Sequence, residues 1–481
     1  MDKQLASRID AYVDEVWEDA VEDIRSLVRI RSVEDTSQAC AGMPWGSANY
    51  EALTQALAIA SRLGLEAHDC EGYLGYADLA GASDVQVATI AHSDVVPEGL
   101  GWTVDPFDIT RREGYLLGRG VIDDKGPLVL SLYAAHFFVR EVQRTGKPLP
   151  YTLRCLVGSC EETTMADVDY YLEHYDAPAF CFTPDADFPL ICGEKGIFHG
   201  QFVTKEPVAG PTAALLSMDA GTVANAIPGL AGAVVSRDAA DFLLSRCTKG
   251  IESEELDDGS VRVTAHGVGG HAAFPEGTEN AIGKLVRLML SENSWWQDAS
   301  LLSFLQMVEK LTRTSDGSAL GIDARDDVFG ALTLNAGVVR TRPDGTCTIT
   351  VDVRYPSSVT SDRLVETFNA LAAKHSCVFT HTMAKEPFYM DPELPAIKTL
   401  LDTYREYSGD ADAEAFVIGG GTYARHFPRA CAFGPHNPAV KDPAWVGSEH
   451  GPDEGVSEEV LRQGLRIYIM SIARLMELDL A

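Results

Sequence analysis

Apolar residues recur at helical spacing over residues 3–29 and then give way to short apolar runs. The first segment predicts an amphipathic helix. The later runs Val85–Ala91, Tyr151–Val157 and Ala179–Phe182 predict buried strands. Strand and helix patterns alternate to about residue 198, which is typical of an α/β fold with a mostly parallel sheet covered by helices.

The pattern changes near residue 200, where a stretch rich in Gly, Pro and Ala begins. Pro343-Asp344-Gly345 marks a turn between two strand-like runs, over residues 332–339 and Cys347–Arg354. We expect an inserted α+β (ferredoxin-like) lid over residues 200–384, and a main α/β domain over 1–199 and 385–481. The expected helices in this part of the chain are Asn280–Leu290 and Ser361–Lys374 in the insert, and Ala396–Tyr407 and Glu458–Leu478 after it, the last with Ser457 as its cap.

Composition narrows the possible partners. The 481 residues carry 71 Asp and Glu against 39 Lys and Arg, a formal net charge of -32. Nucleic acid and anionic membrane both need basic surface, so neither is an expected partner. No apolar run approaches the roughly 18 residues of a membrane span, and the N-terminus opens no signal region. The ten cysteines are scattered singly, which favours reduced thiols and a cytoplasmic location.

Acids and imidazoles follow the predicted strands. His92-Ser93-Asp94, Glu161-Glu162 and Asp185 each come shortly after an apolar run, and Asp123-Asp124 precedes a helix with Pro127 in its first turn. Ligands of open α/β sheets bind outside the carboxyl ends of the strands, so these groups can reach a shared point. Together with His450, they suit a pair of divalent metal ions. Carboxylates with imidazoles favour zinc, manganese or cobalt over calcium.

Each of these signals has an ordinary explanation when it stands alone. A Glu-Glu pair is usually solvated, a His-x-Asp is usually incidental, and an Asp-Asp turn usually caps a helix. Their conjunction at strand ends and helix starts favours chemistry. One glutamate of the pair can hold a metal while its neighbour moves a proton, and Asp94 can orient His92.

Six motifs carry a family resemblance. They are "AHSDVVPEGLGWTVDPF", "GRGVIDDKGP", "SCEETTMADVDYYLEHY", "FTPDADFPLICGEKG", "IGGGTYAR" and "SEHGPDE". The chain resembles the aminoacylase/carnosinase/desuccinylase family of dinuclear zinc metallopeptidases, and within it the peptidase V-like dipeptidases. The resemblance implies two zinc ions bridged by Asp123, with manganese or cobalt as alternatives. It assigns His92 and Asp185 to one ion, Glu162 and His450 to the other, Glu161 as general base and Asp94 as the support of His92. It also implies a cis peptide bond between Asp123 and Asp124.

The inserted segment also matches the family. The resemblance implies that His271 reaches the substrate oxyanion and that Asn225 and Arg354 contact the substrate. Gly419, Gly420, Gly421 and Thr422, with Arg425, are candidates for holding the substrate carboxylate. Peptidase V-like enzymes have an enlarged lid in place of a partner's lid, so the resemblance implies a monomer.

The leading hypothesis is a dipeptidase that removes the N-terminal residue of dipeptides, using a metal-bridging water and a glutamate base. The same centre would suit an amidohydrolase that deacylates N-acyl amino acids. A third hypothesis is a non-catalytic metal- or peptide-binding homologue, against which the complete set of Glu161, five ligands and His271 argues.

Overall fold

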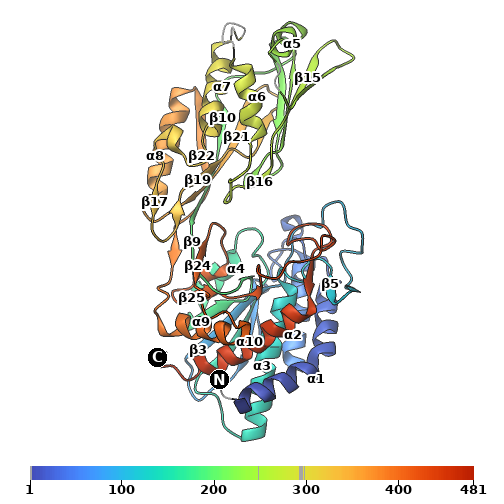
Figure 1. The fold of residues 1–481 in the computed structure, drawn as a ribbon, viewed down its shortest axis with the longest axis vertical. Helices are drawn as coiled ribbons and strands as arrows, with labels where there is room; N and C mark the ends of the chain where they lie inside the picture. Colours follow the sequence, from blue (N-terminus) through green and yellow to red (C-terminus); the bar gives the residue numbers. More distant parts are fainter. Residues whose placement is uncertain (1–2, 247–248, 292–295, 297, 481) are drawn as a thin grey trace. The chain divides into compact units, whose positions relative to one another are not determined.

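The computed structural model describes residues 3–246, 249–291, 296 and 298–480. The chain divides into two compact units (Figure 1). The first unit comprises residues 1–193, 389–416 and 422–481, and the second comprises residues 194–388 and 417–421. The chain passes between them near β9 (Ile191–Glu194), β23 (Phe388–Tyr389) and β24 (Phe416–Ile418).

The first unit is built on a mixed sheet whose centre is parallel. Its strand order is β1-β2-β6-β3-β7-β25-β9. Strand β3 pairs in parallel with both β6 and β7, and β7 pairs in parallel with β25, whereas β1 and β2 are antiparallel. The strands are β1 (Glu66–Cys70), β2 (Leu74–Leu79), β3 (Gln86–His92), β6 (Thr152–Gly158), β7 (Phe180–Thr183) and β25 (Ala430–Ala432).

Helix α3 (Lys125–Thr145) forms the centre of the helical layer. It packs on β3 and β6, and α1 (Lys3–Val28) and α10 (Glu458–Leu475) pack on it in turn. A helix enclosed in this way must be apolar nearly all round, and residues Lys125–Ala135 are buried without a break. The remaining helices of this unit are α2 (Ser47–Arg62), α4 (Ala166–His174) and α9 (Pro395–Ser408), with the short helices η1 (Thr36–Gln38) and η4 (Tyr423–His426).

Small sheets bring the loops of the first unit together. Strands β4 (Thr110–Arg112), β5 (Tyr115–Leu117) and β27 (Gly455–Ser457) form one of them, and β8 (Ala186–Asp187) pairs with β26 (Pro435–His436). Ser457 is the N-cap residue of α10, but its side chain makes no capping hydrogen bond, so the predicted cap is wrong in that respect. The next residue, Glu458, contacts other parts of the unit, because its carboxylate accepts hydrogen bonds from the Trp17 and Arg111 side chains.

The second unit combines an antiparallel sheet with helices. The strand order is β14-β15-β13-β11-β20-β21-β10-β22, with β19 also on β21. The strands are β10 (Gly196–Thr204), β11 (Leu215–Ala220), β13 (Leu230–Val235), β14 (Ile251–Glu255), β15 (Val261–His266), β19 (Thr333–Asn335), β20 (Val339–Thr341), β21 (Cys347–Tyr355) and β22 (Cys377–Lys385). The helices are α5 (Arg237–Leu244), α6 (Ala281–Met289), α7 (Ala299–Thr312) and α8 (Ser361–Lys374), and the short elements are β12 (Ala226–Ile227), β16 (Gly270–His271), β17 (Arg325–Asp326), η3 (Ser318–Leu320) and β18 (Gly330–Ala331).

The predicted hairpin around Pro343-Asp344-Gly345 is present as β20 and β21, but the strand predicted over residues 332–339 is divided into β19 and β20. The break contains Gly337, where an added Cβ would lie 2.3 Å from the Ala224 carbonyl oxygen. Another backbone segment therefore approaches here too closely for a side chain. Over the described residues, none of the helices has the length and apolarity needed to cross a membrane.

Candidate metal centre

The predicted ligands lie where parallel strands end. Strands β3, β6 and β7 are neighbours that run in the same direction, so their carboxyl ends share one edge of the sheet. His92 is the last residue of β3 and is paired with Gly158 at the end of β6. Asp185 follows β7, and the glutamate pair follows β6. The parallel pairing therefore brings together residues that are far apart in the sequence.

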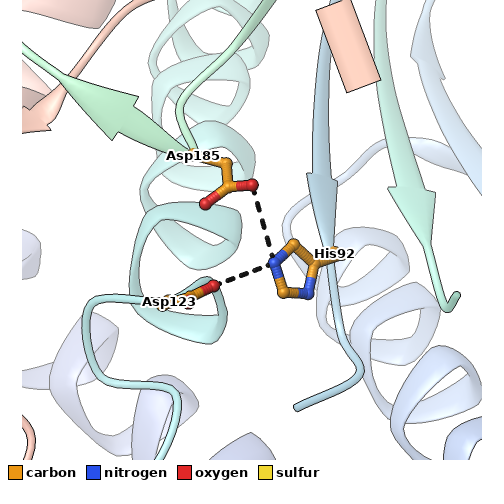
Figure 2. Close-up of side chains that lie close together, drawn as sticks. All are labelled: His92, Asp123 and Asp185. Atoms are coloured by element: carbon orange, nitrogen blue, oxygen red, sulfur yellow. Dashed lines mark hydrogen bonds and ion pairs between the residues drawn. The ribbon is translucent and has the colours of Figure 1, made fainter. Parts of the chain in front are cut away.

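His92, Asp123 and Asp185 form the first ligand cluster (Figure 2). The His92 Nε2 atom lies 3.0 Å from Asp123 Oδ1 and 3.7 Å from Asp185 Oδ2. In Figure 2 both carboxylates point toward the same imidazole nitrogen. This is a compact site with two oxygen ligands and one nitrogen ligand.

Asp123, Glu162 and His450 form a second cluster beside the first. The His450 Nε2 atom lies 2.9 Å from Asp123 Oδ2 and 3.1 Å from Glu162 Oε2. Asp123 thus directs one carboxylate oxygen to each cluster, which is the arrangement of a carboxylate that bridges two ions. The peptide bond between Asp123 and Asp124 is cis, as predicted from the resemblance.

The donor set fits two divalent transition ions. Each cluster offers one imidazole nitrogen and carboxylate oxygens, a combination suited to zinc, manganese or cobalt. Glu162 Oε1 is buried and has no hydrogen-bond partner among the described residues. A buried carboxylate oxygen without a donor is costly, and a bound cation would remove that cost.

The pKa values of these groups reflect negative charge packed into a buried space. Burial, with the neighbouring Asp185 carboxylate, raises the pKa of Glu161 well above its usual range. Burial also raises the pKa of Asp185 to about 7. For Asp123, burial acts in the same direction, but hydrogen bonds from His450 and His92 outweigh it and lower the pKa. Partial burial lowers the pKa of His450, whose side chain is the most exposed of the cluster, and its contacts with Asp123 and Glu162 raise that pKa to about 11.

Asp94 contacts both His92 and the glutamate pair. The His92 Nδ1 atom lies 3.0 Å from the Asp94 carbonyl oxygen and 3.4 Å from its carboxylate Oδ1. The same carboxylate accepts the backbone N–H groups of Glu161 at 3.2 Å and Glu162 at 3.1 Å. Asp94 is therefore in place to orient the imidazole and to fix the backbone of the two glutamates.

Other buried groups hold the ligand loops and were given no function from the sequence. Asp124 accepts the His92 N–H at 2.9 Å. Asp167 accepts the N–H groups of Ser159 and Cys160 and the hydroxyl of Tyr423. Two further such groups, Arg119 and Glu454, lie in the quoted motifs "GRGVIDDKGP" and "SEHGPDE". The sequence signal that could have identified these groups is a charged residue within a motif that also carries a predicted ligand.

The structure places His271, Asn225, Arg354 and Gly419–Gly421 in the second unit. His271 is exposed and pairs with Ala226 across β12 and β16, next to Asn225, whose carbonyl accepts the Ala272 N–H at 2.8 Å. Gly419 lies against the same loop, because an added Cβ would be 2.6 Å from that of Ala273.

Arg354 is buried and engaged with protein groups. Its guanidinium donates to both carboxylate oxygens of Asp352 at 2.9 Å and to the Gly419 carbonyl at 2.9 Å. It therefore links β21 to the glycine loop of the second unit. Thr422 and Arg425 belong to the first unit, where Thr422 accepts the Ala424 N–H at the start of η4.

Residues 88–474 match the model of the peptidase family M20/M25/M40. The chain belongs to this family.

Relatives agree with that membership, and a solved structure has a similar fold. The chain is 31% identical over 467 residues to the putative dipeptidase YtjP of Bacillus subtilis, covering 95% of this chain and 97% of the relative. It is 32% identical to a Beta-Ala-Xaa dipeptidase of Lactobacillus delbrueckii subsp. lactis, covering 87% and 89%. The fold is similar to that of human carnosine dipeptidase 1, with a TM-score of 0.61 and 14% identity over 98% of this chain and 99% of that one.

Proposed function

We propose that this protein is a metal-dependent dipeptidase that releases the N-terminal residue of dipeptides. The observation that carries the proposal is Asp123, whose two oxygens each face an imidazole and a further carboxylate. Family membership and two relatives named as dipeptidases support the same reaction.

Two divalent ions held there would polarise a peptide carbonyl and lower the pKa of a water molecule between them. Glu161 is the general base. In that role it would take a proton from water and pass it to the leaving nitrogen. Asp94 keeps Glu161 in place through its backbone N–H.

We assign substrate binding to groups of the second unit and of η4. His271 would donate to the oxygen that becomes negative as the carbonyl is attacked. Asn225, Gly420, Gly421, Thr422 and Arg425 would bind the substrate backbone and its carboxylate. Arg354 would donate to that carboxylate through the guanidinium N–H groups that are not already bonded to Asp352 and Gly419.

We further propose that the ions are zinc, that the chain works as a monomer because of its large insert, and that it is cytoplasmic. The described cysteines support the last point, since all are free thiols and most are buried.

A substrate screen with Zn²⁺, Mn²⁺ or Co²⁺ tests the reaction. Free dipeptides should be cleaved, whereas the same dipeptides acetylated at the N-terminus, tripeptides and N-acyl amino acids should not. Hydrolysis confined to N-acyl amino acids would replace the dipeptidase by a deacylase. No hydrolysis of any amide would favour a binding protein.

A pair of adjacent variants tests the division of labour. Glu161→Gln should keep both ions and lower kcat by about 10²–10⁴-fold, the usual contribution of a general base. Glu162→Gln should lose metal, because it removes a ligand charge from the His450 cluster. Metal content by mass spectrometry separates the two, and loss of metal from the Glu161 variant would contradict its assignment as base.

A further inference from the structure

We propose that the buried ion pair between Arg119 and Glu454 is a positioning clamp for the metal ion on the His450 side. It joins the loop that carries Asp123 to the loop that carries His450. This inference rests on one part of the proposed function, metal binding at the two clusters, and not on the reaction.

Glu454 holds the backbone of the Asp123 loop. Its carboxylate Oε1 accepts the N–H of Gly120 at 2.9 Å, of Ile122 at 3.3 Å and of Asp123 at 3.5 Å. Its carbonyl oxygen accepts the Gly118 N–H at 2.9 Å. One residue thus fixes the segment that leads into the bridging carboxylate.

Arg119 connects Glu454 to the His450 loop. Its Nη1 atom donates to Glu454 Oε2. Its Nη2 atom lies 3.2 Å from the His450 carbonyl and 3.4 Å from the Gly451 carbonyl. The guanidinium stacks over Trp102 at 5.3 Å, and the side chains of Arg119 and Glu454 are 1% and 0% exposed. The pair is therefore shielded from water and from screening by salt.

The two histidine ligands differ in how they are supported. His92 ends a central strand, is fully buried, and is held by the sheet and by Asp124. The His450 side chain is 55% exposed, and its backbone has a φ of 61°, a left-handed conformation that a non-glycine residue adopts only when its surroundings hold it. Arg119 supplies that hold through the His450 carbonyl.

Because, of the two histidine ligands, only His450 depends on the ion pair, breaking the pair should weaken the binding of one metal ion more than that of the other. Glu454→Gln keeps an oxygen for the backbone N–H groups and removes the charge that Arg119 needs. Loss of groups that orient metal ligands commonly lowers affinity by about 10–100-fold. We expect that loss for the His450-side ion, while the His92-side ion keeps its affinity within about threefold of wild type.

The test is a stepwise titration of the metal-free full-length chain with Co²⁺, followed by its visible absorption and by calorimetry. His450→Ala supplies the reference spectrum of the ion on the His92 side. The pair Arg154–Asp78 offers a control, since it is a bidentate, partly buried ion pair joining β2 to β6. Asp78→Asn should lower thermal stability and leave both Co²⁺ affinities unchanged.

Raising the metal concentration should restore kcat of the Glu454→Gln variant with KM unchanged, which a general loss of structure would not allow. If that variant does not fold, Arg119→Lys keeps the charge, loses the planar contacts to the two carbonyls, and should weaken the same ion. The proposal is overturned if the two ions weaken equally, if neither weakens, or if the wild type binds a single equivalent. A wild type that binds two ions but cleaves no dipeptide would refute the proposed function and leave the clamp standing.

Discussion

Tyr423→Phe removes one hydroxyl from a fully buried site beside the loop that leads from β6 to Glu161 and Glu162. That hydroxyl donates to Asp167 Oδ2 at 2.6 Å, and the same oxygen accepts the N–H of Ser159 at 2.8 Å and of Cys160 at 3.1 Å. A hydrogen bond to a charged group contributes roughly 1.5–3 kcal/mol. The variant should therefore lower the free energy of unfolding of the first unit by about 2 kcal/mol.

The loss should depend on pH. Burial raises the pKa of Asp167 to about 6, while the Tyr423 hydroxyl and the backbone donors oppose that rise. Since the folded pKa lies above the unfolded value of about 3.9, the stability contributed by Asp167 is complete below pH ~4 and is lost as the pH rises through 6. Removing the hydroxyl raises the folded pKa further. The variant should thus be most destabilised above pH 6 and approach wild type near pH 4.

Urea denaturation of the metal-free chain at pH 8 and pH 5 measures this difference. Hydrogen exchange should also show faster exchange of the Ser159 and Cys160 amides. Because Asp94 still holds the N–H groups of Glu161 and Glu162, kcat should fall by less than about tenfold.

Tyr171→Phe is the matched control. Tyr171 is equally buried and lies on α4 like Asp167, but its hydroxyl accepts a hydrogen bond from Arg154 at 2.7 Å and donates none to Asp167. It should destabilise the first unit without changing exchange at Ser159 and Cys160. A Tyr423→Phe effect of equal size at both pH values, or unchanged exchange at these amides, would refute the reasoning.

Three further predictions follow from packing and charge. Gly158→Ala places a Cβ 2.1 Å from the Tyr423 hydroxyl oxygen and should cost about 1–3 kcal/mol, so an unchanged Tm would contradict it. Burial and Arg140 lower the pKa of His136 to about 4, so the unfolded chain binds more protons and stability falls as the pH drops from about 6.5 to 4. Discounted for partial exposure, the resulting loss in the free energy of unfolding is about 1–2 kcal/mol. Urea denaturation at pH 7.5 and 4.5 measures this loss, and His136→Gln should abolish it. Removing metal with a chelator at pH 7.5 should be accompanied by proton uptake, because the pKa of His450 is about 11 in the metal-free protein. Calorimetry in two buffers of different ionisation enthalpy measures this uptake, and equal heats in the two buffers would contradict the prediction.

The sequence by itself determined the alternation of strands and helices in the first unit and the strand ends after which the candidate ligands lie, whereas α5 and α7 of the second unit were not predicted. Helices were located within a few residues, as for the segment predicted over 3–29 and observed at Lys3–Val28, because burial on one face imposes a 3.6-residue period. The predicted closing helix ends earlier, at Leu475, where that period no longer constrains the chain. The parallel order of β3, β6 and β7 then brings His92, Glu162 and Asp185 to one edge, which the alternation of strands and helices had implied.

Only the tertiary structure decided which groups hold the ligands in place. Arg119 and Glu454 are 335 residues apart, and Tyr423 and Asp167 are 256 apart, so no local pattern relates them. Arg354 is buried, with its guanidinium on Asp352 and on the Gly419 carbonyl. Asp94 binds the Glu161 and Glu162 backbone as well as the His92 ring. Such contacts join loops that lack periodicity, and a buried N–H donor or carboxylate acceptor pairs with whichever partner the fold brings within hydrogen-bond distance.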